Sequence, residues 1–263
     1  MDWRQKTTIV VALLQAGCAA LPQPDPSPTI QSAGRPYGQL VIHSDFRLPE
    51  SHRLIREIVA ERDDVSRTLE LPTTEEPIHV HLFRDGTRYA NYMRQRYPAM
   101  PDRRAFFVET DTQLLVYAHW GDRVAEDLRH EVAHGYLHAA VGQLPLWLDE
   151  GLAEYFEVPR GHDGLNRPHL DLLLVLQARG AWSPDLERLE RLTDFAELSQ
   201  RDYAESWAWV HFLLTSDSPH RQVLQSALAE LRNRGTTEPI SERLATLHVE
   251  PGSTLVEHLK AIP

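Results

Sequence analysis

The chain has 263 residues, a hydrophobic content of 42% and a formal net charge of −11. This length permits one large domain or two small ones, and the apolar content is ample for a buried core. The negative charge, together with the lack of a basic stripe or a base-stacking module, argues against nucleic acid as a partner.

Residues 1–18 have the pattern of a bacterial secretion signal: a basic start, a short apolar stretch and then small residues. The sequence Ala16-Gly17-Cys18 resembles the end of a lipobox, in which the cysteine is acylated. Gln15 departs from that pattern, because a lipobox usually has an apolar residue there. We expect lipidation at Cys18, with cleavage by the ordinary signal peptidase near residues 19 and 20 as the alternative. Cys18 is the only cysteine, so no disulfide can form within the chain.

Residues 19–36 contain five prolines among small and polar residues, which predicts an extended tether. A tether directly after an acylated cysteine would hold the folded part away from a membrane surface. We therefore expect a protein of the bacterial cell envelope, lipid-anchored or secreted on the periplasmic side. The only expected membrane contact is the N-terminal lipid, and the sequence does not specify an oligomeric state.

The folded part, residues 37–263, is expected to be an α+β domain. Residues 37–120 form a mixed α/β part with a small mixed sheet, and residues 121–263 form a mainly helical part. Periodicity predicts strands over 39–43, 77–83, 105–108 and 113–118, the last two as a hairpin. Helices are predicted over 50–69, 87–97, 124–140, 170–179, 203–215, 221–232, 240–247 and 254–261, with a further helix that begins at 145.

The helix over 124–140 carries the motif H-E-x-x-H, from His130 to His134. Residues four apart lie on one face of a helix, so the two imidazoles can converge on one metal ion with Glu131 beside it as a general base. Asp122 is the expected N-cap, and Gly142 ends the helix. The alternative is a pair of buried histidines with no ligand.

The helix that begins at Pro145 supplies an acidic candidate ligand, Glu150, and a second glutamate on the same face, Glu154. Gly151 predicts a close approach to another helix, because a helix interior otherwise disfavours glycine. Two histidines and one glutamate leave the fourth position of a zinc ion open for water, which is the pattern of catalytic sites. A solvated acidic face is the alternative for these glutamates, and Glu157 is expected to belong to it.

These two segments resemble the gluzincin metallopeptidases, above all the peptidase MA-like family, whose second segment reads P-L-W-L-x-E-G-L-A-E-Y. They are also similar, more distantly, to the aminopeptidase N family. The resemblance implies a zincin-like metallopeptidase fold with one Zn²⁺ held by His130, His134 and Glu150. It implies Glu131 as the general base and Glu154 as a carboxylate that orients a zinc histidine.

A further match begins at Tyr203, in Y-A-E-S-W-A-W-V, which resembles a segment of aminopeptidase N-like enzymes. The resemblance implies that the Tyr203 phenol stabilises the oxyanion of the transition state. The alternative is that Tyr203 simply opens an amphipathic helix. We do not expect His138 to be a ligand of the same ion. Together with His130 and His134 it makes three histidines at intervals of four residues, which span about 12 Å along a helix. His79 and His81 are expected on the outward face of a strand.

The sequence therefore predicts a zinc metallopeptidase that acts on a peptide or protein. We expect the strand over 113–118 to be a sheet edge that pairs with an extended substrate. Nothing in that strand matches the G-x-M-E-N segment that binds a free substrate amine, which favours an endopeptidase. The alternatives are a non-catalytic zinc-binding envelope lipoprotein that serves as a binding or scaffolding module, and hydrolysis of a non-peptide amide.

Overall fold

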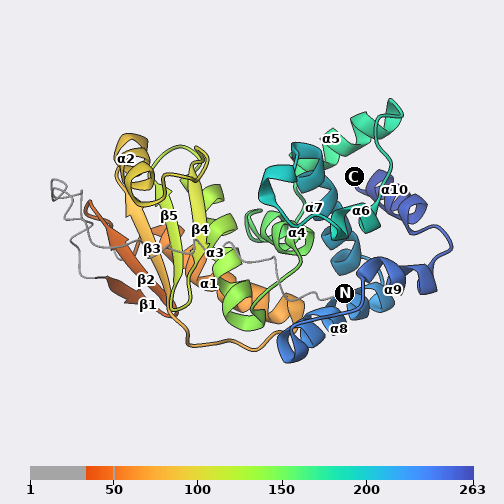
Figure 1. Ribbon diagram of the computed structural model, residues 1–263, viewed down its shortest axis with the longest axis horizontal. Coiled ribbons are helices and arrows are strands. Elements are labelled where there is room, and N and C mark those ends of the chain that lie inside the picture. The colour runs from red at the N-terminus through yellow and green to blue at the C-terminus, as the bar shows by residue number, and fades with distance from the viewer. Residues whose placement is uncertain (1–33, 50) are drawn as a thin grey trace, which may run out of the picture.

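A five-stranded mixed sheet forms the first part of the chain and a group of helices forms the rest (Figure 1). The computed structural model describes residues 34–49 and 51–263. The strands are β1 (Arg35–Tyr37), β2 (Leu40–Ser44), β3 (Ile78–Phe83), β4 (Ala105–Glu109) and β5 (Leu114–His119). Their order in the sheet is β1-β2-β3-β5-β4, with β2, β3 and β5 parallel and the two outer strands antiparallel to their neighbours.

Helices cover both faces of the sheet. The helices α1 (Arg53–Leu69) and α3 (Val124–Val141) pack on one face, where Ile78, Val80 and Val116 belong to the main core. The opposite face carries a smaller aromatic core under α2 (Gly86–Arg96), in which Tyr89 contacts Phe83. Alternate residues of the central strands thus point to the two cores, as the period of a strand requires.

The second part of the chain consists of helices that follow α3. They are α4 (Leu146–Phe156), α5 (Arg167–Ala178), α6 (Leu186–Glu190), α7 (Gln200–Thr215), α8 (Ser218–Arg234), α9 (Ile240–Leu247) and α10 (Pro251–Ala261), with a short 3₁₀ turn over Phe195–Glu197. A capping box between Ser199 and Asp202 fixes the start of α7. In the part of the chain that the structure describes, no helix has the length and apolarity to cross a membrane.

The prediction of a mixed α+β fold is confirmed, with a sheet part followed by a helical part. Gly151 also lies where a close helix contact was predicted. A Cβ atom added there would lie 2.6 Å from the backbone oxygen of Ser206, so α4 and α7 touch through their backbones. Both helices are almost completely buried along this contact.

Three local predictions differ from the structure, and one α-helix was not predicted. The strand over residues 113–118 is not an edge: β5 lies between β3 and β4, and β4 is the edge strand on that side. Asp122 is not the N-cap of α3, because Arg123 occupies that position without a side-chain cap. The short helix α6 was not predicted at all. Arg35 and Pro36, expected in the tether, belong to β1.

The predictions for the N-terminal region fall on residues that the structure does not describe. Cys18, the secretion signal and nearly all of the tether lie outside the described residues. They stay predictions.

Replacement of Gly151 by alanine is expected to lower the free energy of unfolding by about 1–3 kcal/mol, because the new methyl group pushes α4 away from α7. The control is Gly121→Ala, where the nearest atom to the added Cβ is 3.4 Å away and the expected change is under about 0.5 kcal/mol. Urea denaturation of both variants in the same metal state measures the difference. Equal stability of Gly151→Ala and the unmodified protein would contradict the close contact.

Candidate metal centre

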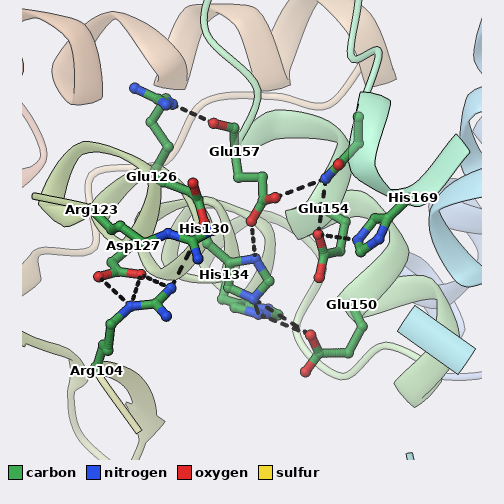
Figure 2. Close-up of polar contacts among 12 residues, drawn as sticks. Arg104, Arg123, Glu126, Asp127, His130, His134, Glu150, Glu154, Glu157 and His169 are labelled. Carbon is green, nitrogen blue, oxygen red and sulfur yellow. Dashed lines mark hydrogen bonds and ion pairs between the residues drawn. The ribbon is translucent and has the colours of Figure 1, made fainter. Parts of the chain in front are cut away.

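Three side chains from two helices meet at one point beside the sheet. His130 and His134 lie one turn apart on α3, and Glu150 comes from α4. The two imidazole Nε2 atoms are 3.2 Å apart. The Glu150 Oε2 atom lies 3.5 Å from Nε2 of His130 and 3.9 Å from Nε2 of His134. Figure 2 shows both rings turned towards the Glu150 carboxylate.

These separations suit a tetrahedral zinc ion. Bonds near 2.1 Å in tetrahedral geometry place ligand atoms about 3.4 Å apart, and the three observed distances scatter around that value. Oε2 of Glu150 is also buried, and it has no hydrogen-bond partner within the described part of the chain. A buried carboxylate oxygen that faces two imidazole nitrogens fits a cation held between the three, so the donor set fits Zn²⁺.

The other nitrogen of each imidazole faces a carboxylate from α4 or from the residue that follows it. Nδ1 of His134 lies 2.8 Å from Oδ1 of Asp149, and Nδ1 of His130 lies 3.1 Å from Oε2 of Glu157. A carboxylate accepts from an N–H at Nδ1, which leaves the lone pair of Nε2 free for a metal. Both ligand histidines are therefore oriented for metal binding.

Asp149 is itself held by His138, which donates to its second oxygen at 3.0 Å. His138 in turn contacts Glu109, at the end of β4, at 2.7 Å. Burial opposes the charge of His138, but Asp149 and Glu109 outweigh it and raise its pKa to about 10. Burial likewise opposes ionisation of Asp149, yet His134 and His138 hold its pKa well below the ordinary value. His138 thus supports the carboxylate that faces Nδ1 of His134.

Glu154 is hydrogen-bonded to Asn166 and His169 and not to either candidate ligand histidine, His130 or His134. Its Oε2 lies 2.7 Å from Nε2 of His169 and accepts from Asn166, although it stays within 4.8 Å of ligand atoms of His130 and Glu157. The orienting role expected for Glu154 falls instead to Glu157. Glu157 was expected on a solvated face, but its side chain is largely buried and hydrogen-bonded to His130 and Asn166.

Asp149 and Glu157 are the site residues that reasoning from the sequence missed. Asp149 directly precedes Glu150, and Glu157 lies two helical turns beyond it on the same face. The spacing of Glu157 was a usable signal. His79 and His81 alternate on β3 with the buried residues Ile78 and Val80, and the His81 ring stacks on Tyr117.

A cleft of about 1000 Å³ opens at His130, one of the three candidate ligands, and Glu131 and Tyr203 also line it. Burial raises the pKa of Glu131, while the two histidines and the backbone N–H of Phe107 act against that rise. The Tyr203 hydroxyl is 3.2 Å from Nη2 of Arg103. Burial and the nearby Glu150 raise the pKa of Tyr203. The structure thus brings the expected base and the expected phenol to the same cleft as His130.

Comparison with known proteins gives a family match over residues 124–235, which contain α3, α4 and α7; the family is described as a protein of unknown function, DUF1570. No curated protein matches the sequence. The M1 zinc metallopeptidase from Deinococcus radiodurans is 19% identical, with a TM-score of 0.48 over 88% of this chain and 51% of that chain. A two-domain M1 zinc metallopeptidase variant bound to L-arginine is 18% identical, with a TM-score of 0.44 over 84% and 47%. The chain spans about half the length of these structures, and TM-scores below 0.5 assign it no activity.

Glu150→Ala is expected to lower zinc affinity by more than about 100-fold, beyond the loss typical of an outer-layer substitution, because it removes one of three candidate ligands. Glu187→Ala, at an exposed carboxylate whose side chain is 74% accessible, is the control and should keep one zinc per chain. Elemental analysis after dialysis, with competition against a chromophoric chelator, gives stoichiometry and affinity. Unchanged zinc binding in Glu150→Ala would rule this residue out as a ligand.

Asp149→Asn is expected to weaken zinc binding by about 10–100-fold, because His134 loses the carboxylate that fixes its Nδ1 proton. Asp171→Asn, at an exposed position on α5, is the matched control. The same chelator competition measures both variants. Equal affinities for the two would show that Asp149 does not orient the ligand.

Proposed function

We propose that this chain is a zinc-dependent metallopeptidase, a hydrolase that cleaves peptide bonds with activated water. The observation that carries the proposal is the orphaned Glu150 oxygen opposite two imidazole nitrogens, next to a cleft that Glu131 lines. A donor set of two histidines and one glutamate has an open fourth position for water or substrate, which structural zinc sites do not have.

Zn²⁺ would be held by Nε2 of His130, Nε2 of His134 and Oε2 of Glu150, and when bound it lowers the pKa of a water molecule to about 7. Glu131 follows His130 directly in the chain and reaches the cleft from the same helix. Its carboxylate would accept a proton from the attacking water and pass it to the leaving nitrogen. A scaffolding protein has no need of such a base, so Glu131 favours an enzyme over a non-catalytic zinc-binding module.

The edge strand β4 is the surface that we propose for an extended peptide. The Phe107 ring stacks against His134 with centroids 5.8 Å apart, so the middle of β4 lies beside the candidate ligands. Because β5 pairs with only one side of β4, the outer side can pair with a substrate backbone. Binding along a strand does not require a free substrate terminus. This supports endopeptidase action on a peptide or protein substrate.

We also propose that the enzyme works in the bacterial cell envelope, lipid-anchored or secreted. The proposal rests on the sequence of residues 1–36, with Cys18 at the end of a lipobox-like segment. Mass spectrometry of the mature N-terminus distinguishes an acylated Cys18 from an unmodified N-terminus near residues 19 and 20.

Glu131→Gln is expected to keep one zinc per chain and to lower the rate of hydrolysis by at least about 100-fold, because the amide cannot accept the proton of water. Glu126→Gln is the control, since Glu126 lies on the same helix and lines the same cleft but pairs with Arg123. Cleavage of casein and of a peptide library, measured with chelator and with zinc added back, gives the activity. Full activity of Glu131→Gln would exclude it as the base. A zinc-loaded protein that cleaves neither substrate would favour the non-catalytic module.

A further inference from the structure

Arg103 is a positive charge at the cleft that forms no ion pair with an acid among residues 34–49 and 51–263. It lies two residues before β4 and lines the cleft together with His130, Glu131 and Tyr203. Among the described residues, its polar contact is the Tyr203 hydroxyl, and its guanidinium also lies 5.9 Å from the centre of the Phe106 ring. Three of the other four arginines that line the cleft are paired with acids: Arg104 with Asp127, Arg123 with Glu126 and Arg129 with Glu57. The fourth, Arg167, belongs to the first turn of α5.

The contact between Arg103 and Tyr203 has a fixed direction. A guanidinium has five N–H donors and no acceptor, so the phenolic oxygen must accept. The Tyr203 O–H is then free to donate to a third group in the cleft. Arg103 keeps its remaining donors as well, because the phenol occupies one of them. Two donor side chains from segments 100 residues apart thus lie side by side. Each has a donor hydrogen that their mutual contact does not use.

The pair also lies close to the candidate metal centre. Burial opposes the charge of Arg103, but Tyr203, Glu150 and Glu131 together hold its pKa above the ordinary value. Glu150 likewise acts on Tyr203. The candidate ligand and the candidate base are therefore within electrostatic range of this cation. A positive charge placed there favours negative charge that develops on a bound molecule.

We propose that Arg103 and Tyr203 form one anion-binding site, which takes the tetrahedral oxyanion produced when water adds to the substrate carbonyl. This proposal rests on the proposed hydrolysis. The oxygen of water bonds to the carbonyl carbon, its proton passes to Glu131, and the π electrons move onto the carbonyl oxygen. Arg103 and Tyr203 donate hydrogen bonds to that oxygen. When the C–N bond breaks, the electrons return to form the carbonyl and the nitrogen takes the proton from Glu131.

The first test is kinetic and uses the zinc-loaded protein with a peptide that it cleaves. Arg103→Met is expected to lower kcat by about 100-fold or more with little change in KM, as for loss of an oxyanion donor. Arg103→Lys should recover part of that loss in kcat, since lysine keeps the positive charge but lacks the forked N–H donors of a guanidinium.

Because the two donors bind one oxygen, Arg103→Met combined with Tyr203→Phe should lower kcat by less than the product of the two single effects. Arg123→Met, at another arginine of the cleft, is the control and should keep its kcat. An unchanged kcat in Arg103→Met, with zinc content equal to that of the control, would overturn the proposal.

The second test needs no turnover. The zinc is exchanged for Co²⁺, and inorganic phosphate, a tetrahedral oxyanion, is titrated against the visible spectrum. Arg103→Met should raise the phosphate Kd by at least about 10-fold, the loss of one charge-assisted hydrogen bond. Arg123→Met should leave it unchanged. Equal Kd values for Arg103→Met and the unmodified protein, or a lack of phosphate binding in the unmodified protein, would overturn the anion site. If phosphate binding depends on Arg103 while no peptide is cleaved, the proposed peptidase function fails and the anion site stands.

Discussion

The Glu150 carboxylate is kept out of water by the packing of α4 between α3 and α7. One of its oxygens has no hydrogen-bond partner among the residues that the structure describes. Burial of an uncompensated charge costs several kcal/mol of folding free energy. A cation opposite this oxygen would therefore stabilise the folded state by a comparable amount. His130 and His134 present nitrogen atoms, which compensate a carboxylate only through a proton or a metal ion. Binding of a metal ion at this candidate site would therefore be coupled to folding of the helical part through this one group.

The same packing explains how the cleft is assembled. Gly151 lets the backbone of α4 touch α7 at Ser206, and a larger residue would separate the two helices. Tyr203 lies one helical turn before Ser206, so the close contact also sets the position of the phenol. On the opposite side, α3 is fixed to the sheet by the main core and carries the two histidines. The candidate groups thus come from three helices, and the spacing of two of them, α4 and α7, depends on one glycine.

Local patterns in the sequence were sufficient for most helices and for the three candidate ligands. His130, His134 and Glu150 follow from spacing on two helices, and Gly151 follows from its unusual place inside one of them. The edge strand was mispredicted, because the order β3-β5-β4 depends on contacts between segments far apart in the chain. Arg103 had no local signal either, since its partner is 100 residues away.

The choice between Glu154 and Glu157 shows a finer limit. Both glutamates are placed near His130 by helical spacing, and their side-chain contacts decide the role of each. Asn166 donates hydrogen bonds to both carboxylates, and His169 is hydrogen-bonded to Glu154. Glu157 is therefore the one that accepts a hydrogen bond from His130. Both partners come from the start of α5, so the outer layer of the site is completed by a helix that contributes no ligand.

The segment from Asp149 to Glu157 therefore does more than supply one ligand. It provides Glu150 for the metal and the two carboxylates that orient the histidines of α3. These three acids occupy fixed positions on one helical segment, so a shift of α4 along α3 would disturb all of them together. A series of hydrogen bonds runs from His134 through Asp149 and His138 to Glu109. It opposes such a shift, because it links α4 to the end of β4. These hydrogen bonds thereby fix the position of the edge strand proposed for substrate relative to the ligands proposed for zinc.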